Sequence, residues 1–447
     1  MSFKFVESLE NDELRLDLPT LRLINSKGFA FEGSGQFVWM PSDSKLMAFT
    51  NGGEHLTSTF GELFQCSPGQ IVPDSEYLRI EGETLDKWRF ETARVSKGDF
   101  HIRQGSSSVV WEIPTDHFGS QIVLSRTTES AKKTWTRLLL SEVEIPYWPR
   151  TSKTLNDNPI FGGECHTHDW LQCVGKFGTL SAKKLTDDRV EVIVNEGDYS
   201  ADDLMLSIQT SFGFLSGRTV NVLGYERTEG ENSRRILPIW KPEITRRRIS
   251  PPLGSGPECG LFVEKFLTNA VEYFATEQGK EVGNLLFACW DVADNAFTSR
   301  ILVTCAAVES FAELLGSEAH SETTLTGDQK ISLMAFVTDS KFDSTFNNRL
   351  HGFLNTVNAP NARNMLEEWS RIGYSGITSD DVAAWSKLRN AAAHGRRIWS
   401  DDFERNQEAL NRARRVETMI NRLVLDQMGY VGHFYDYVEW NHKPMLS

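Results

Sequence analysis

Three polar side chains with the means to bind and cleave a phosphodiester lie close together near the end of the chain: Arg389, Asn390 and His394. An imidazole exchanges protons near neutral pH, and a guanidinium offers paired donors to a phosphate. In a helix Asn390 and His394, four residues apart, share a face, so the amide can orient the imidazole. Arg389 lies about 140° around an ideal helix from His394, but its long side chain can swing toward the same site.

Metal-free cleavage of RNA needs side chains of these kinds. A base must take the proton of the ribose 2′-hydroxyl, and an acid must protonate the leaving 5′-oxygen. A cation must stabilise the charge that develops on the phosphate. Each chain's motif supplies a single histidine, so two copies meeting across a dimer interface would complete the set. Ala391, Ala392 and Ala393 carry little bulk, which would let a second helix approach.

The elements that must position this motif are helices. Apolar residues at helical spacing predict a bundle of long helices with short connections, and Ser379-Asp380-Asp381 begins the helix that stops near Gly395. Trp385 and Leu388 would face its core. The predicted helices cover roughly 258–278, 282–316 (long enough to be two), 328–337, 344–356, 361–372, 379–398 and 402–428.

The earlier part of the chain is β-rich, apart from a helical pattern from Leu204 to Leu215. Short strands separated by glycine-containing turns predict an antiparallel sandwich or barrel-like sheet. They are expected around 36–40, 77–80, 87–90, 109–113, 121–124 and 190–194. The fold class is therefore α+β and multidomain. We expect a β-rich domain over 1–230, a basic, proline-rich connector over 231–257 and an all-α domain over 258–447.

Composition and charge narrow the class of protein. The 447 residues are 40% hydrophobic and 24% charged, as in ordinary globular domains, and the net charge of -14 argues against non-specific coating of nucleic acid. Neither a signal peptide nor an apolar run of membrane-spanning length is apparent, so we expect no membrane association. Scattered cysteines without a paired motif favour a reducing cytoplasm.

The Arg-Asn-x3-His-Gly sequence, here Arg389 to Gly395, resembles that of HEPN domains. The resemblance implies a helical bundle that dimerises to bring two motifs together and cleaves RNA without a metal or other cofactor. In that scheme Arg389 and His394 are catalytic, and Asn390 gives polar support. The resemblance makes the expected activity that of an endoribonuclease.

The wider layout resembles the ApeA-like group of HEPN proteins, which join a β-rich N-terminal domain to a C-terminal HEPN domain. The stretches that look alike are 33–41, the helix 301–315 with Glu309, the motif itself and 429–436. The resemblance implies an effector of bacterial anti-phage defence by abortive infection. The expected partners are an RNA substrate (tRNA is one candidate), a phage-derived trigger sensed by residues 1–230, and a second copy of the chain.

Plainer interpretations stand beside each of these. Arg389 and His394 also suit a surface arginine and a capping imidazole, which would leave a non-catalytic nucleotide-binding or dimerisation module beside a β-rich partner-binding domain. Glu309, in a very apolar helix, needs a cationic partner, either Arg389 or Arg300. A further set is either an RNA-backbone track or a solvated, ion-paired helix face; it comprises Arg396, Arg397, Arg405, Arg412 and Arg415.

A short segment carries zinc-type ligands at poor spacing: Cys165, His166, His168 and Cys173. Structural zinc usually takes its ligands from two separated pairs, and neighbouring side chains of an extended segment point oppositely. A loop with incidental polar residues is the favoured interpretation, and no metal site is assigned.

Overall fold

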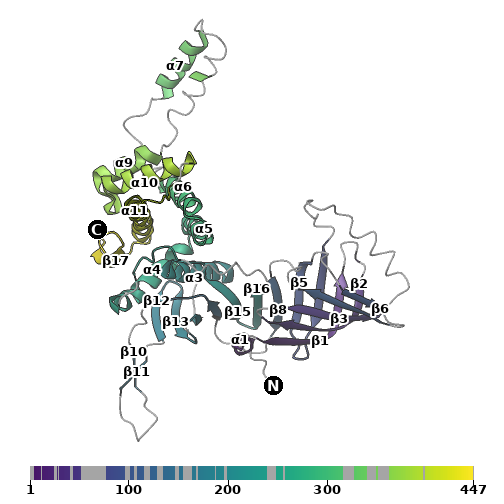
Figure 1. Cartoon of the computed structure of the whole chain (residues 1–447). Helices are drawn as coiled ribbons and strands as arrows, with labels where there is room; N and C mark the ends of the chain where they lie inside the picture. The colour runs from purple at the N-terminus through teal and green to yellow at the C-terminus, as the bar shows by residue number, and fades with distance from the viewer. Residues whose placement is uncertain are drawn as a thin grey trace. The chain divides into compact units, whose positions relative to one another are not determined.

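The computed structural model describes most of the helices and strands of the chain. The described residues are 5–11, 13–24, 28, 30–40, 44–51, 77–95, 101–104, 108–114, 121–127, 134–145, 151–154, 164–167, 170–186, 188–195, 199–238, 248–254, 257–315, 327–339, 349–350, 362–395 and 398–445. The chain divides into two compact units (Figure 1). The first comprises 1–213, 219–244 and 263–275, and the second comprises 214–218, 245–262 and 276–447.

The first unit is built on one 14-stranded sheet among its described residues, in which every neighbouring pair of strands is antiparallel. The expected antiparallel β-rich region is confirmed, as one hydrogen-bonded sheet. Its spatial order is β12 (Trp170–Gly175), β13 (Gly178–Lys184), β14 (Arg189–Asn195), β9 (Trp135–Ser141), β15 (Asn221–Glu229), β16 (Asn232–Pro238), β8 (Gln121–Thr127), β5 (Arg89–Val95), β4 (Leu78–Glu83), β1 (Leu14–Ile24), β2 (Ala30–Trp39), β3 (Lys45–Asn51), β7 (Ser108–Pro114) and β6 (His101–Gln104). A separate hairpin joins β10 (Thr151–Thr154) to β11 (Glu164–Thr167).

The alternation of β1 shows how the sequence forms this sheet. Leu14, Leu16 and Leu18 are buried and the residues between them are exposed, as a period of two requires. The register on β2 then shifts between Leu18 and Leu21, at the Pro19–Thr20 pair. The shift moves the buried set by one residue, so that Leu21 returns to the core face.

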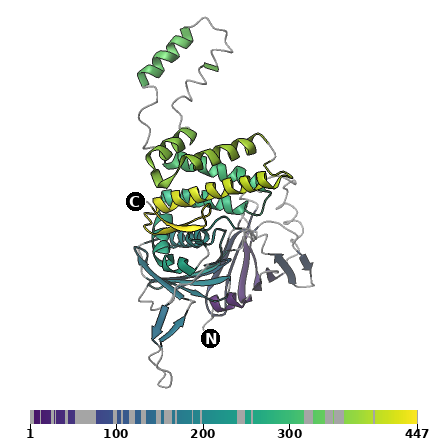
Figure 2. The same cartoon turned by 60° about the vertical axis from the view of Figure 1, so that its left-hand side comes forward.

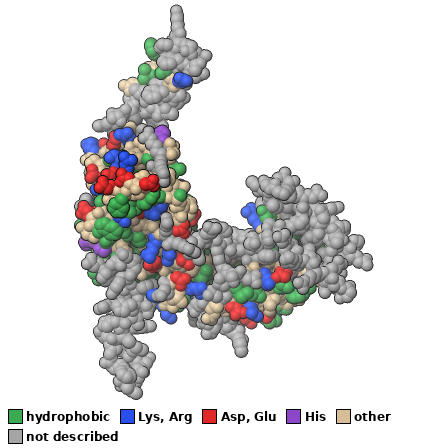
Figure 3. Space-filling model, viewed as in Figure 1, with side chains coloured by type: hydrophobic (Ala, Val, Ile, Leu, Met, Phe, Trp, Pro, Cys, Tyr) green, Lys and Arg blue, Asp and Glu red, His purple; other side chains and the backbone are tan. Residues whose placement is uncertain are grey.

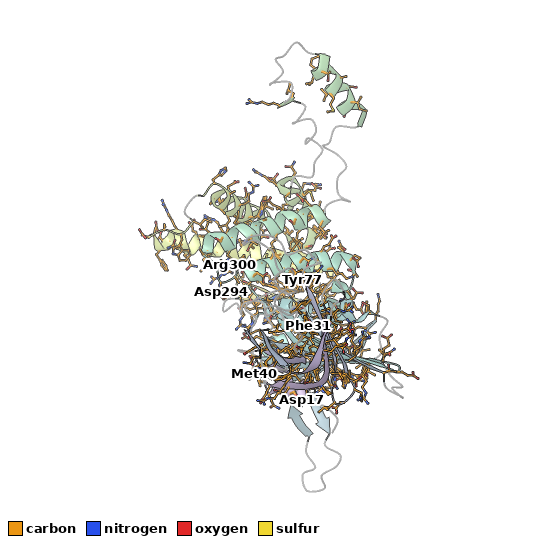
Figure 4. All side chains as sticks on the ribbon, turned by 90° about the vertical axis from the view of Figure 1, so that its right-hand side faces the viewer. Asp17, Phe31, Met40, Tyr77, Asp294 and Arg300 are labelled. Atoms are coloured by element: carbon orange, nitrogen blue, oxygen red, sulfur yellow. The ribbon has the colours of Figure 1, made fainter. Side chains whose placement is uncertain are left out.

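The main core of this unit lies on that face, and the close approach of neighbouring strands requires a glycine at one position. Phe37 on β2 and Phe90 on β5 are fully buried, with ring centres 5.8 Å apart. A side chain at Gly33 of β2 would lie 1.9 Å from the backbone oxygen of Phe49 on β3, so only glycine allows this approach. Phe31 packs at the margin of the cluster and is labelled in Figure 4.

The described part of the first unit also contains α1 (Phe5–Glu10), α3 (Ala201–Ser216, whose last residues fall in the second unit) and α4 (Val263–Phe274). The helix expected near 204–215 is thus present as α3. Helix α4 packs on β12, where the Glu272 carboxylate accepts a hydrogen bond from the backbone N–H of Lys176 at 2.7 Å. The sequence placed residues 258–278 with the C-terminal helices, whereas the contacts place α4 with the sheet.

The prediction of a connector over 231–257 is wrong in its first part, which forms strand β16. Arg235, which resembled part of a basic linker, is buried there and pairs with Glu226 on β15 at 2.8 Å. Its guanidinium also lies 4.0 Å from the centre of a Trp88 ring. A cation with a carboxylate partner and an aromatic face can occupy an internal strand, which a composition argument misses.

The second unit is helical, and in Figure 2 its helices α10 and α11 lie side by side. The expected helix over 282–316 is two helices, and the region expected at 344–356 lies almost wholly outside the described residues. The helices here are α5 (Glu277–Asp291), α6 (Phe297–Leu315), α7 (Gly327–Asp339), α9 (Ala362–Ile372), α10 (Ser379–Ala393) and α11 (Phe403–Gln427), with short 3-10 turns at Pro257–Leu261 and Tyr374–Gly376.

The sequence predicted an all-α C-terminal domain, but the structure contains a β-hairpin there. Strands β17 (His433–Asp436) and β18 (Asn441–Pro444) form a hairpin after α11. Its Lys443 bridges Asp436 and Glu439, at 2.7 Å from each carboxylate. Through the described part of the chain, no helix combines the length and apolar character that crossing a membrane requires.

Candidate functional site

Helix α10 carries the Arg389–His394 motif and has well-defined ends. Thr378 caps its first turn in a reciprocal capping box with Asp381, whose carboxylate accepts from the Thr378 backbone N–H at 3.0 Å. At the other end His394 is the capping residue, and Gly395 follows with φ of 62°. Because glycine adopts this left-handed conformation without strain, the sequence stops the helix directly beside the imidazole. The predicted start at Ser379 and the stop near Gly395 are confirmed, although the helix ends at Ala393 and does not reach residue 398.

Two buried contacts fix α10 against its neighbours. The indole N–H of Trp385 donates to the backbone oxygen of Cys305 on α6 at 3.1 Å. Asp381, 3% exposed, forms an ion pair with Arg422 of α11 at 2.5 Å, and Arg422 also donates to the backbone oxygen of Gly376. These contacts hold the first half of the helix, so the residues after Trp385 extend from a fixed support.

Arg389 projects from α10 toward α6 and meets Glu309. Its Nε donates to Oε1 of Glu309 at 2.9 Å, with 43% of the Arg389 side chain and 31% of the Glu309 side chain exposed. The hydrogen bond that Arg389 donates to Glu309, followed by the charge of that carboxylate, raises the pKa of the already basic Arg389 further, so the guanidinium stays protonated. Only Nε is engaged among the described residues, which leaves the two terminal nitrogens accessible.

The sequence left two partners open for Glu309, and the structure selects one. Arg300, which Figure 4 labels near the start of α6, instead forms an ion pair with the buried Glu417 of α11. The other oxygen of Glu417 accepts from the Ser250 hydroxyl at 2.6 Å. Arg300 thus belongs to a structural cluster, and Glu309 is left to Arg389.

Asn390 and His394 lie on the outer face of α10. They share that face, as the four-residue spacing predicted, and both side chains are exposed. No hydrogen bond joins the amide to the imidazole, and within the described residues neither side chain has another partner. The expected orientation of His394 by Asn390 is therefore absent, and the imidazole is accessible to a ligand or a partner chain.

The three alanines do not form one flat surface. Ala392 is 8% exposed and faces the unit's own core, Ala391 is half-buried, and Ala393 is exposed. A helix turns by about 100° per residue, so three successive side chains cannot share one face. Only Ala393 is fully open to a partner helix.

The arginines that follow the motif are largely ion-paired. Arg412 pairs with Glu408 at 2.6 Å, and Arg405 lies 3.6 Å from Asp402. Arg415 lies 3.5 Å from the buried Asp381. Figure 3 shows acidic and basic side chains interspersed on the visible surface of the helical unit. This pairing agrees with the interpretation of these arginines as a solvated, ion-paired helix face. Arg396 and Arg397 lie outside the described residues.

The zinc-type segment is divided between β11 and β12. Cys173 is buried under α4, and this burial raises the pKa of its thiol to about 12. The side chains of Cys165, His166 and His168 lie outside the description. Among the described residues no group of three or more metal-binding side chains is found.

One feature that the sequence did not single out is a groove between α9 and α10, with a volume of about 410 Å³. Its α10 side includes Ser386 and Lys387, which precede Asn390 by four and three residues. Helical spacing alone places them on the face of Asn390, so the signal was present in the sequence. The groove itself needs α9, whose position follows from tertiary packing.

Comparison of the chain with protein-family models, with curated proteins and with solved structures gave no match.

Proposed function

We propose that this protein is a metal-independent endoribonuclease of the HEPN type, active as a dimer in which two α10 motifs face one cleft. As an effector of anti-phage defence, it would be held inactive until a trigger reaches the β-rich unit. The proposal rests on the motif, on its helical setting and on the resemblance to ApeA-like proteins. Its chemistry uses this chain's own side chains.

In this scheme one His394 takes the proton of the ribose 2′-hydroxyl, which attacks the neighbouring phosphorus atom. A 2′,3′-cyclic phosphate forms as the bond to the 5′-oxygen breaks, and the second His394 of the dimer protonates that oxygen. Arg389 binds the phosphate oxygens through its terminal nitrogens and stabilises the charge that develops there. Asn390 hydrogen-bonds to the substrate beside the imidazole.

The observation that carries the proposal is the pairing of Arg389 with Glu309. The pair engages Nε and leaves the terminal nitrogens, which are the fork that grips a phosphate. Glu309 holds the guanidinium in one direction without burying it, because both side chains are partly exposed. Glu309 is thus a positioning residue for Arg389.

The test is to incubate the purified full chain with labelled total RNA in the presence of EDTA, beside His394→Ala and Arg389→Ala variants. We expect cleavage by the unmodified chain alone, with 2′,3′-cyclic phosphate ends. A strict need for a divalent metal, or 5′-phosphate products, would mean a different mechanism. Binding of RNA without cleavage would instead identify the non-catalytic binding module.

A further inference from the structure

The groove between α9 and α10 has a mainly apolar wall that carries three hydroxyls and one amine without a hydrogen bond or ion pair to another described residue. Its volume of about 410 Å³ falls within the range of small-ligand clefts, roughly 300–1,000 Å³. The lining comprises Arg363, Glu367, Ser370, Ser379, Val382, Ala383, Ser386 and Lys387. None of the three serine hydroxyls hydrogen-bonds to another described residue.

The groove has a net positive charge from one side chain. Arg363 and Glu367 pair with each other along α9 at 2.8 Å and offset one another. Lys387 is exposed and forms no ion pair with any described residue. An unpaired ammonium beside free hydroxyls favours an anionic ligand with hydrogen-bonding oxygens, which a sugar–phosphate chain provides.

The groove and the motif share one face of α10. At about 100° per residue, Ser379, Ser386, Lys387, Asn390 and His394 fall within roughly 100° of one another around the helix axis. Lys387 and His394 are separated by about 10 Å along the axis, at 1.5 Å per residue. One short strand can therefore contact the groove and the imidazole together.

We infer that this groove binds the sugar–phosphate backbone of single-stranded RNA on one side of the scissile phosphate, with Lys387 contacting a phosphate and Ser386 a neighbouring oxygen. This inference rests on the proposed ribonuclease function. The described lining residues include no aromatic ring, so they offer no base-stacking platform. Recognition in the groove is accordingly of the backbone and independent of sequence.

The experiment measures binding of a fluorescent 2′-O-methyl oligoribonucleotide, which lacks the 2′-hydroxyl nucleophile, to the full chain over a series of salt concentrations. Lys387→Ala should weaken binding about tenfold, which corresponds to one charge-assisted contact. It should also reduce the slope of log affinity against log salt by about 0.7, the value for one phosphate contact on a single strand. Lys265→Ala, at an exposed lysine on α4, is the matched control and should change neither.

A second variant blocks the groove without removing charge. Ala383→Trp places a ring in the cleft from an exposed position, so it should lower RNA affinity while leaving the thermal unfolding transition in place. Equal affinity and equal salt slope in wild type and Lys387→Ala would overturn the inference, as would absence of binding by the wild type. Equally tight, Lys387-dependent binding of polyglutamate would also overturn it, because the groove would then be a general site for acidic peptides.

The outcomes separate this inference from the proposed activity. If the wild type cleaves total RNA but Lys387→Ala does not change binding, the ribonuclease proposal stands and the proposal of RNA binding in the groove fails. If binding of the oligonucleotide depends on Lys387 but no RNA is cleaved, the groove binds RNA and the ribonuclease proposal fails.

Discussion

Arg389 on α10 and Glu309 on α6, 80 residues apart in the chain, meet through a 2.9 Å hydrogen bond from Nε to Oε1. Both side chains remain partly open to solvent, so the pair adds little to folding stability; exposed pairs contribute about 0.2–1 kcal/mol. What the pair does achieve is to fix the direction of the guanidinium. Loss of Glu309 should therefore change the direction of the Arg389 side chain more than the stability of the fold.

Glu309→Ala should lower the rate of RNA cleavage by roughly 10- to 100-fold, with stability changed by less than about 1 kcal/mol, because Arg389 loses its support but not its charge. Glu309→Gln retains an oxygen that accepts from Nε and should keep most of the activity. Single-turnover cleavage and urea denaturation measure the two effects. Equal activity in the alanine variant and the wild type would remove Glu309 from the site.

Mixing two inactive variants tests the composite dimer. If each site takes its arginine and histidine from opposite chains, half of the dimers in an equal mixture of Arg389→Ala and His394→Ala are mixed. Each mixed dimer keeps one arginine and one histidine on opposite chains but lacks the second histidine that protonates the leaving oxygen, so the mixture should regain a measurable part of the activity, well below that of the wild type. A mixture as inactive as its components would place both groups of a site on one chain.

Ala393→Trp should weaken dimerisation and cleavage together, because Ala393 is the exposed alanine of the motif. Ala392→Trp is the contrasting variant: Ala392 faces the core, and overpacking there typically costs about 1–3 kcal/mol. Sedimentation velocity and thermal unfolding distinguish the two effects. A dimer undisturbed by Ala393→Trp would move the interface away from this helix end.

Asp381→Ala should destabilise the helical unit by about 3–5 kcal/mol, because it leaves Arg422, with a side chain 11% exposed, without its carboxylate. It also removes one half of the capping box. Asp402→Ala, which removes the exposed cap of α11 and an exposed contact with Arg405, should cost about 1 kcal/mol. Urea unfolding of the two variants compares them; similar losses would mean that the buried pair adds nothing beyond a cap.

Burial raises the pKa of the Cys289 and Cys305 thiols from their ordinary value of 9.0 to about 12. The folded chain keeps these protons while the unfolded chain loses them above pH 9, so this contribution to stability is present below pH 9 and is lost as pH rises toward 12. Iodoacetamide at pH 8 should spare both thiols in the native chain and modify them in urea. Peptide mass spectrometry measures this, and rapid native labelling would mean that α5 and α6 open readily.

The sequence by itself determined the features that depend on local spacing. The alternation in β1, the Thr378 capping box and the stop at Gly395 are set by neighbouring residues, so the helix that carries the motif could be predicted with its ends. That Asn390 and His394 share one face followed in the same way from the period of the helix, whereas the exposure of that face depends on how the helix packs.

Only the tertiary structure decided which distant charges meet. Glu309 had two candidate cations, and the packing of α10 and α11 on α6 gave it Arg389 while Glu417 took Arg300. The sequence places Arg235 in a connector, whereas in the structure it pairs with Glu226 and lies over the Trp88 ring. Ion pairing and burial depend on residues far apart in the chain, and a local pattern carries no record of them, because the same arginine suits a linker, a surface or a core until its partner is placed.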